Sequence, residues 1–204
     1  NSACTSFHAA MNLLSMMDPD KVPPFVLSVV PEGLTRTVDY NDRTAAVLWG
    51  DGAAAAVLST REPGRARILG NTLEGSPAGH LKVHIARQGH FHQEGRTVQM
   101  FAIKKTARGL KGLRRDFEED GRSLHFVGHQ ANRLMLEKVC EVCEVTPDRH
   151  HHNVVRYGNT AGAGSPSVVS MRWDDWGDDD DVAVVGVGAG LTWSGFLVRF
   201  GGEQ

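Results

Sequence analysis

The amino-acid sequence predicts an α/β protein whose helices and strands are stacked in layers. Stretches with helical spacing of apolar residues alternate along the chain with short apolar runs that are typical of strands. The 204 residues are 41% hydrophobic and 23% charged, which are ordinary globular values and exclude disordered, collagen-like and coiled-coil classes. A chain of this size buries a sizeable core without covalent cross-links.

The first third of the chain predicts a helix followed by short strands. Apolar residues recur at helical spacing over 4–17. The run 25–30 is apolar almost throughout, which is typical of a strand buried on both faces. Two further strands are expected at 45–48 and 53–58, around a glycine-rich turn, and 66–70 is expected to pair beside them.

The middle of the chain predicts a loop, two helices and one strand. Residues 74–97 are rich in His and Gly and show no clear period, so we expect a loop there. A long helix is predicted over 98–118. The apolar strand 124–127 is expected to lead into a helix over 131–143.

The last quarter of the chain predicts two paired strands after a polar connection. A short strand is expected at 153–155 and a helix at 167–173. The segment 174–181 contains six Asp residues and is expected to be a solvated connection. Residues 182–187 predict a buried strand, and 191–200 an amphipathic strand that pairs with it across a glycine-rich turn.

Two further observations concern the organisation of the chain. A break in composition at Arg61-Glu62-Pro63-Gly64 separates a front part from the rest. The segments 45–58 and 182–200 look alike, because each reads as strand, glycine-rich turn and strand. This similarity hints at an internal duplication.

Charge and cysteine content narrow the classes of function. The net charge of −2 leaves no excess of positive charge for a nucleic-acid backbone. No apolar run approaches the ~20 residues of a membrane-spanning helix, so no membrane partner is expected. The three cysteines, Cys4, Cys140 and Cys143, are too few and odd in number for a disulfide framework, which favours a reducing cytoplasm.

Cys4 is the first candidate for reactive chemistry. It lies among small residues at the predicted N-terminal end of a helix. Unpaired backbone N–H groups and the helix dipole stabilise a thiolate there, so we expect a lowered thiol pKa. Cysteine is also a common buried residue, and a structural role stays open on position alone.

His129 and Asn159 each lie between a predicted strand and a predicted helix. Proteins of the α/β class place ligand-binding groups at such strand ends. A lone histidine like His129 is more often structural. Asn159 lies in Gly158-Asn159-Thr160, where a neutral amide either donates to an oxygen or serves as a turn or N-cap residue.

The order of Cys4, His129 and Asn159 along the chain is shared by two classes of enzyme. Papain-like cysteine proteases use His to activate Cys and Asn to orient His. Their signature C-G-[SA]-C-[WY] is absent here, because the sequence reads Ala3-Cys4-Thr5-Ser6-Phe7. The second class is that of the thiolase-like condensing enzymes.

Five sequence blocks resemble a ketoacyl-acyl-carrier-protein synthase III of the thiolase-like superfamily. They stand in family order from residue 1 to residue 200, which makes the resemblance specific. The blocks are the helix that carries Cys4, Arg43 with Gly50-Asp51-Gly52-Ala53, His129-Gln130-Ala131-Asn132, Gly158-Asn159-Thr160, and Gly188-Ala189-Gly190-Leu191-Thr192-Trp193 with Leu197-Val198-Arg199-Phe200.

The resemblance implies a thiolase-like layered α-β-α-β-α architecture, of which this chain is the C-terminal part. Residues 1–61 would end the N-terminal half and carry the nucleophile. Residues 62–204 would form the C-terminal half, which carries His129 and Asn159.

The same resemblance implies a thioester-dependent acyltransferase. Cys4 would hold an acyl group as a thioester, while His129 and Asn159 donate hydrogen bonds to a malonyl-type or beta-keto thioester that then forms a carbon–carbon bond. Backbone N–H groups of Cys4 and of the turn around Ala189 would hold the oxyanion of that step. Acyl-CoA or acyl-carrier-protein thioesters would be substrates in fatty-acid or polyketide biosynthesis, with no permanently bound cofactor.

Departures from the family pattern leave alternatives open. Ala189 stands in a turn that usually reads three Gly, and residues 74–97, which shape the acyl pocket in the family, do not match closely. One alternative is a non-condensing acyltransferase that forms an ester or amide through Cys4. Another is a subunit of a heteromeric condensing enzyme; the assembly expected is a homodimer or a hetero-oligomer.

Basic residues on the long predicted helix suggest a second surface of interest. Lys104, Arg108, Lys111 and Arg115 form one stripe at helical spacing. The simplest interpretation is a solvated face. A sharper one is a docking surface for an acidic carrier protein, to which Arg133 beside the His129 motif would contribute.

No metal site is predicted. The run His150-His151-His152 and the histidines at 84, 90 and 92 invite a zinc interpretation, but structural zinc sites use four ligands at compact spacing, usually with Cys. Cys140 and Cys143 form C-x-x-C inside a helical run. The segment 174–181 lacks the spacing of a calcium-binding loop.

The position of Cys4 leads to a prediction about stability. In the family the nucleophile follows most of the N-terminal half, whose strands and helices build half of the layered core. We therefore expect residues 1–204 alone to be unstable, and the preceding segment to come from a separate or cleaved chain or to be left out of the recorded sequence. Size-exclusion chromatography and an acylation assay on these residues alone check this, and a soluble, active monomer would contradict it.

Overall fold

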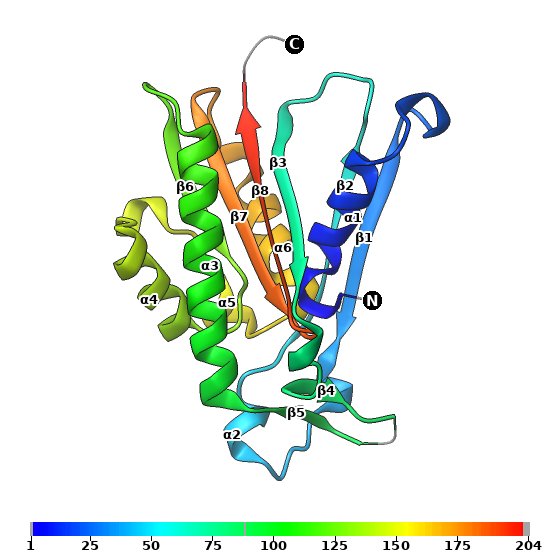
Figure 1. Ribbon diagram of the computed structural model, residues 1–204, viewed down its shortest axis with the longest axis vertical. Coiled ribbons are helices and arrows are strands. Elements are labelled where there is room, and N and C mark those ends of the chain that lie inside the picture. The colour runs from blue at the N-terminus through cyan, green and yellow to red at the C-terminus, as the bar shows by residue number, and fades with distance from the viewer. Residues whose placement is uncertain (1, 88, 202–204) are drawn as a thin grey trace.

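A four-stranded sheet forms the centre of the protein, whose computed structural model describes residues 2–87 and 89–201 (Figure 1). The strand order is β3-β8-β7-β6, with β6 parallel to β7 and the other neighbours antiparallel. A separate antiparallel pair and a short hairpin complete the strands. The strands are β1 (Val26–Gly33), β2 (Asp51–Leu58), β3 (Ala66–Gly75), β4 (Val83–Ile85), β5 (Phe91–Gln93), β6 (Ser123–Gly128), β7 (Asp180–Gly188) and β8 (Thr192–Phe200).

Helices cover both faces of the four-stranded sheet. The helices are α1 (Ser6–Ser15), α2 (Arg43–Ala46), α3 (Gly95–Phe117), α4 (Arg133–Cys143), α5 (Val154–Tyr157) and α6 (Gly164–Met171). Helices α3 and α4 pack on one face, and α1 and α6 lie between the other face and the β1–β2 pair (Figure 1). The predicted layered α/β class is therefore confirmed, with the layers in the order helix, sheet, helix, sheet.

The period of two in strand β7 explains how one sheet holds two helical layers. Ala183 and Val185 point into the apolar cluster formed with α3 and α4. Val182 and Val184 point into the cluster formed with α1 and α6. Because successive side chains of a strand point to opposite faces, a strand that is apolar throughout is buried on both.

Strand β8 is buried along almost its whole length, so the predicted amphipathic character of 191–200 is wrong. Leu197 points into the cluster with α3 and α4, and Phe196 and Val198 point into the cluster with α1. The physical reason is its position between β3 and β7, with helices on both faces. Strand β3 pairs with β8 and not with β2, which corrects the pairing expected for 66–70.

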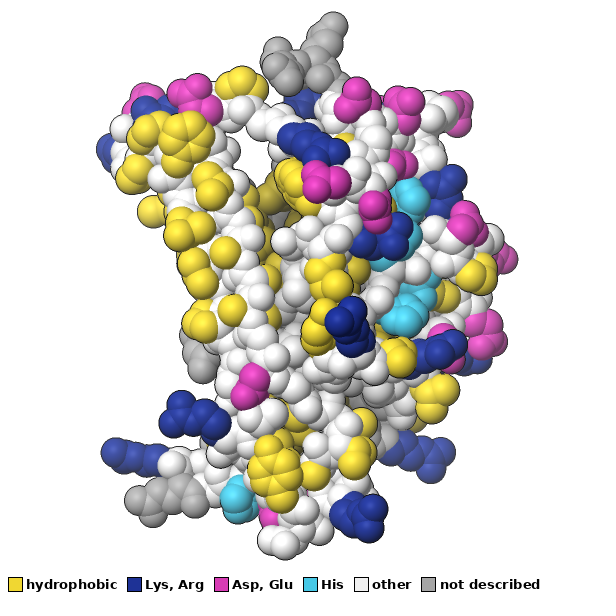
Figure 2. Space-filling view, turned by 180° about the vertical axis from the view of Figure 1, so that it is seen from behind, with side chains coloured by type: hydrophobic (Ala, Val, Ile, Leu, Met, Phe, Trp, Pro, Cys, Tyr) yellow, Lys and Arg dark blue, Asp and Glu magenta, His cyan; other side chains and the backbone are white. Residues whose placement is uncertain are grey.

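Strand β1 is not buried on both faces, which corrects the expectation for 25–30. Val30 packs toward α1, whereas Leu27 and Val29 on the opposite face are 64% and 52% exposed. Within the described residues, helices cover only one face of the β1–β2 pair. Figure 2 shows the resulting column of hydrophobic side chains along this pair.

Two short apolar segments form helical turns where strands were expected. The segment 45–48 overlaps α2, which begins where Asp42 Oδ1 accepts the backbone N–H of Thr44 at 2.9 Å. The segment 153–155 begins α5, where the side chain of Gln130 accepts the backbone N–H groups of Asn153 and Val154. The likeness between 45–58 and 182–200 as strand–turn–strand units therefore does not hold.

The remaining elements follow the predictions more closely. The predicted helices 4–17, 98–118, 131–143 and 167–173 correspond to α1, α3, α4 and α6, and the strands 53–58, 124–127 and 182–187 to β2, β6 and β7. The predicted loop 74–97 contains the hairpin β4–β5. The division into 1–61 and 62–204 stays a prediction.

In the described part of the chain, no helix has both the length and the apolar character needed to cross a membrane.

The Asp-rich segment is solvated only in part, because Asp181 is buried. Asp181 is 1% exposed at the start of β7. Its carboxylate lies 2.8 Å from Nη2 of Arg199 and 2.9 Å from Nε of Arg122. Arg199 also contacts Glu119. A buried carboxylate needs such partners, so the expected solvated connection ends before this residue.

Removing this carboxylate should destabilise the fold strongly. We expect Asp181→Ala to lower the free energy of unfolding by about 3–5 kcal/mol, because Arg199 then stays buried without its main partner. The exposed Asp179 provides a matched control, and Asp179→Ala should change stability by about 0.5 kcal/mol or less. Denaturant titration of both variants checks this, and equal losses would contradict it.

Candidate active site

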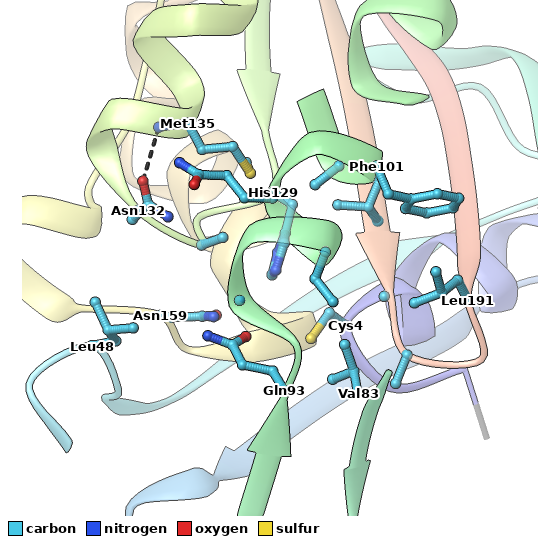
Figure 3. A pocket seen from close by; sticks show the side chains of 18 of the residues that line it. Cys4, Leu48, Val83, Gln93, Phe101, His129, Asn132, Met135, Asn159 and Leu191 are labelled. Atoms are coloured by element: carbon cyan, nitrogen blue, oxygen red, sulfur yellow. Dashed lines mark hydrogen bonds between the residues drawn. The ribbon is translucent and has the colours of Figure 1, made fainter. Parts of the chain in front are cut away.

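Cys4, His129 and Asn159 meet at one cavity although they lie far apart in the sequence. The cavity has a volume of about 250 Å³, and all three residues line it. Figure 3 shows their side chains converging on this space from three different segments. The structure therefore brings together the three residues that the sequence predicted as a site.

Cys4 lies in a short 3₁₀ helix, η1 (Ala3–Thr5), directly before α1. The preceding Ala3 has φ of 45°, a left-handed conformation that is strained for a residue with a side chain. The hydroxyl groups of Thr5 and Thr192 lie 2.8 Å apart, and Thr192 donates to the carbonyl of Ala189. These hydrogen bonds hold the 3₁₀ helix that contains Cys4 against the turn that joins β7 to β8.

The pKa of the Cys4 thiol is raised to about 12, mainly by burial and further by the nearby Glu32 carboxylate. The expected lowering of this pKa is therefore wrong. The helix N-terminus is present, but loss of water around the sulfur outweighs it. Cys4 is a neutral thiol at physiological pH, so its proton must leave as the sulfur attacks.

His129 follows β6 directly and is 5% exposed. Its backbone N–H donates to the carbonyl of Val185 at 2.9 Å, which continues the pairing of β6 with β7. Burial lowers the pKa of the imidazole to about 4. The ring is therefore neutral above that pH, with one N–H to donate and one nitrogen that accepts.

The residues after His129 hold it in place. Gln130 is fully buried; its amide donates to the Gly128 carbonyl at 2.7 Å and accepts from the backbone of Asn153 at 2.9 Å. Asn132 accepts the backbone N–H of Met135 at 2.8 Å and so caps α4. In this motif His129 presents its imidazole to the cavity, while Gln130 and Asn132 form the hydrogen bonds that fix the loop.

Asn159 is held by its backbone and presents its amide to the cavity. Its N–H donates to the Leu48 carbonyl at 2.7 Å, and its carbonyl accepts from Gly50 at 3.1 Å. The side-chain Oδ1 accepts the N–H of Ala161 at 2.9 Å. The oxygen is therefore occupied, and the NH₂ group is left to donate into the cavity.

Two glycine motifs of the sequence pack against each other beneath Asn159. A Cβ atom on Gly50 would lie 1.9 Å from the carbonyl oxygen of Tyr157, and Gly158 has φ of 68°. Only glycine allows this approach of two backbones. The motifs Gly50-Asp51-Gly52 and Gly158-Asn159-Thr160 are therefore two sides of one contact.

The turn between β7 and β8 forms the wall beside the cysteine. A Cβ atom on Gly188 would lie 3.2 Å from the backbone nitrogen of Cys4, and Ala189 lines the cavity. The predicted oxyanion groups, the N–H of Cys4 and that of Ala189, belong to these two adjacent segments. Their role stays a prediction.

The predicted carrier-binding residues lie outside the cavity. Lys104, Arg108 and Lys111 are exposed on α3, and Arg133 is exposed at the start of α4. Arg133 forms an ion pair of 2.6 Å with Glu137 one helical turn later. None of the four lines the cavity, and their contact with a carrier protein stays a prediction.

The candidate metal ligands do not form a cluster in the described residues. No group of three or more His, Cys, Asp or Glu side chains there is arranged to hold a metal ion. Cys140 and Cys143 are buried on α4 in the core against α3. The rings of His84 and His92 lie 5.2 Å apart across the β4–β5 hairpin.

Three residues near the cavity carried no role in the sequence analysis. Gln130 was part of a motif, but Asn153 and Val154, whose backbone N–H groups its amide oxygen accepts, are distant in sequence. Glu32 on β1 accepts the N–H of Gly162 at 3.1 Å and so ties β1 to the loop of Asn159. Gln93 lines the cavity from β5, within the segment that was expected to be a loop. Its neighbours His92 and Glu94 are also polar, so nothing in the local sequence singled it out.

Known proteins resemble this chain over nearly its whole length. Residues 1–77 match the family profile of 3-oxoacyl-[acyl-carrier-protein (ACP)] synthase III, and residues 123–200 match the profile of its C-terminal part. A beta-ketoacyl-[acyl-carrier-protein] synthase III of Gloeobacter violaceus is 32% identical, with 98% of this chain and 66% of the relative covered. The corresponding protein of Oceanobacillus iheyensis is 30% identical, with 98% and 65% covered.

Solved structures show the same fold. The 3-oxoacyl-[acyl-carrier-protein] synthase III of Aquifex aeolicus superimposes with a TM-score of 0.87 at 25% identity, covering 97% of this chain and 65% of that one. The synthase III of Thermus thermophilus gives a TM-score of 0.88 at 27% identity, covering 98% and 67%. The predicted thiolase-like fold is confirmed over the part that this chain represents. The chain spans about 65% of the length of the curated relatives it matches.

Buried imidazoles should make stability depend on pH. His129 and His8 are nearly or fully buried, and burial lowers their pKa values from 6.5 to about 4 and about 3. Between these pKa values and pH 6.5 the unfolded chain binds more protons than the folded chain. The free energy of unfolding therefore falls as the pH falls, by up to about 1.4 kcal/mol per pH unit for each imidazole.

Denaturant titrations at several pH values across this window check the slope. The variant His8→Leu removes one of the imidazoles whose pKa burial lowers, a group that also includes His125, His150 and His151, and it should show a shallower dependence than the unaltered protein. An unchanged slope in this variant would contradict the contribution of His8.

Proposed function

The chain belongs to the 3-oxoacyl-[acyl-carrier-protein] synthase III family, and we propose that it carries the reactive site of an acyltransferase that condenses two thioesters. The observation that carries this proposal is the meeting of Cys4, His129 and Asn159 at one cavity. A thiol, a neutral imidazole and a free amide NH₂ are the groups that such a reaction needs.

In the first step the sulfur of Cys4 attacks the carbonyl carbon of an acyl thioester. The bond from that carbon to the thiol of CoA or of a carrier protein breaks, and an acyl–Cys4 thioester forms. Because the pKa of Cys4 is raised to about 12, its proton is lost during attack and passes to the departing thiolate. One thioester and one thiol are present both before and after the step, so the atoms balance.

In the second step a malonyl-type thioester loses carbon dioxide beside His129 and Asn159. The electron pair of the broken carbon–carbon bond moves into an enolate, and negative charge develops on the thioester oxygen. The Asn159 NH₂ and an N–H of the neutral His129 ring both donate to that oxygen. Donors fixed in a buried site stabilise this charge more than water does, because they are already oriented.

In the third step the enolate carbon attacks the carbonyl carbon of acyl–Cys4. The new carbon–carbon bond replaces the bond to sulfur, and the Cys4 thiolate that leaves takes up a proton from solvent and returns to the thiol. Backbone N–H groups of Cys4 and Ala189 would hold the oxyanion formed on the way, because the turn of Gly188 lies directly against the backbone of Cys4.

The substrates would be thioesters of CoA or of an acyl carrier protein, in fatty-acid or polyketide biosynthesis. The exposed stripe of Lys104, Arg108 and Lys111 on α3 would attract an acidic carrier protein. Arg133 would contribute from the start of α4, on the same side of the sheet as α3.

The first step can be tested by the mass of the protein. Incubation with a panel of acyl-CoA thioesters should add one acyl group to the purified protein, and Cys4→Ala should abolish this addition because no other described cysteine lines the cavity. Intact-mass spectrometry measures the adduct. An undiminished adduct on the alanine variant would contradict the role of Cys4.

The same experiment separates the later steps. The variants His129→Ala and Asn159→Ala should still take up the acyl group, whereas release of carbon dioxide from malonyl thioester should fall by about a hundredfold or more, the typical cost of one oxyanion donor. Acylation of the unaltered protein without any release of carbon dioxide would favour the non-condensing acyltransferase.

A further inference from the structure

The cavity has apolar walls and a few polar side chains that the proposed chemistry does not use, among them Trp49, whose buried indole N–H has no hydrogen-bond partner in the described residues. The walls are formed by Val83, Phe91, Val98, Phe101, Met135 and Leu191. Besides Cys4, His129 and Asn159, the amide side chains on the lining are Gln93, Gln99 and Asn132. Asn132 caps α4, and Gln99 is an exposed residue near the start of α3, so Gln93 is the half-buried amide that remains.

Gln93 points into the reactive space. It lies at the end of β5, opposite Val83 of β4, which also lines the cavity. Figure 3 shows its carboxamide directed toward the region where the side chains of Asn159 and Cys4 also point. In the described part of the chain its amide has no hydrogen-bond partner, whereas the oxygen of Asn159 is bound by Ala161.

The β4–β5 hairpin holds Gln93 in this position. Phe91, two residues earlier, packs edge-on against Trp49, with ring centroids 4.3 Å apart. The backbone N–H of Glu94 donates to the carbonyl of Lys82 at 2.9 Å. The backbone on both sides of Gln93 is therefore held in place, while its side chain has no hydrogen-bond partner among the described residues.

An amide that loses water without gaining a partner is costly. When a substrate fills the cavity, its walls exclude water around Gln93, so a purely alkyl acyl group leaves this amide unpaired. A hydroxyl group on the substrate can both donate to the amide oxygen and accept from the amide nitrogen. A site built around a hydrogen-bonding group discriminates strongly against analogues that lack the matching group.

We propose that Gln93 is a specificity-determining residue, and that the site prefers acyl thioesters with a hydroxyl group close to the thioester over alkyl acyl groups of the same shape. This inference rests on the proposed function, because it assigns the substrate class of the same site. It adds a recognition role for a residue that takes no part in bond formation.

A pair of thioesters of nearly equal shape tests the preference. 3-Hydroxybutanoyl-CoA and 3-methylbutanoyl-CoA differ by a hydroxyl in place of a methyl group. The rate constant for acylation of Cys4 by each is measured from intact-mass time courses with the purified protein. We expect the hydroxyl substrate to react faster by about tenfold or more, which is the effect of one buried hydrogen bond.

Variants connect the preference to this residue. Gln93→Met keeps the length of the side chain and removes its polar atoms, so the preference for the hydroxyl substrate should disappear or reverse. Gln93→Leu repeats the test with a second apolar side chain. Gln99→Met is the matched control, because it removes an amide from the exposed rim, and the preference should persist. Thermal unfolding confirms that each variant is folded.

The outcomes separate this inference from the function on which it rests. Acylation of Cys4 at equal rates by both thioesters, or an unchanged ratio in both apolar variants of Gln93, would overturn the role of Gln93 and leave the acyltransferase intact. Failure of every thioester to acylate Cys4 would overturn both.

Discussion

The candidate site depends on close contact between backbone segments at two glycines. Gly50 meets the carbonyl of Tyr157, and Gly188 meets the backbone of Cys4. A side chain at Gly50 would push the loop of Asn159 away, because its Cβ atom would lie 1.9 Å from that carbonyl oxygen. A side chain at Gly188 would crowd the backbone around Cys4, with the nearest atom 3.0 Å from its Cβ. These contacts join segments separated by more than a hundred residues, so the geometry of the cavity is a property of several loops at once.

Burial of the same loops sets the protonation of the reactive groups. It raises the pKa of Cys4 to about 12 and lowers that of His129 to about 4, so both groups are neutral. Loss of water penalises the charged form of each group, whichever its sign. A site of neutral donors and a neutral thiol suits a reaction in which charge appears on the substrate oxygen and is stabilised there.

The four-stranded sheet supplies the rigid frame for this arrangement. Strand β6 ends at His129, and β7 and β8 lead into and out of the turn of Gly188 and Ala189. The central strands are apolar on both faces and are covered by helices on both, which places the ends of β6 and β7 at one edge of a firm core. Reactive loops held by such a frame are more precisely placed than loops on the surface.

The sequence by itself determined the layered class, most helices, and the residue types of the site. Helix α4 was predictable because its period is local and Asn132 caps it nearby. The blocks around Cys4, His129 and Asn159 were recognisable as motifs in order. These features depend on residues close together in the chain, so they can be read without the fold.

Only the tertiary structure decided what each segment touches. The pattern of 25–30 resembles that of a doubly buried strand, yet Leu27 and Val29 are exposed, because exposure depends on which layers lie on either side. Asp181 reads as one of six acidic residues, and only the positions of Arg122 and Arg199 bury it. The pKa of Cys4 and the direction of Gln93 likewise follow from burial, which arises between segments distant in sequence and is absent from any local pattern.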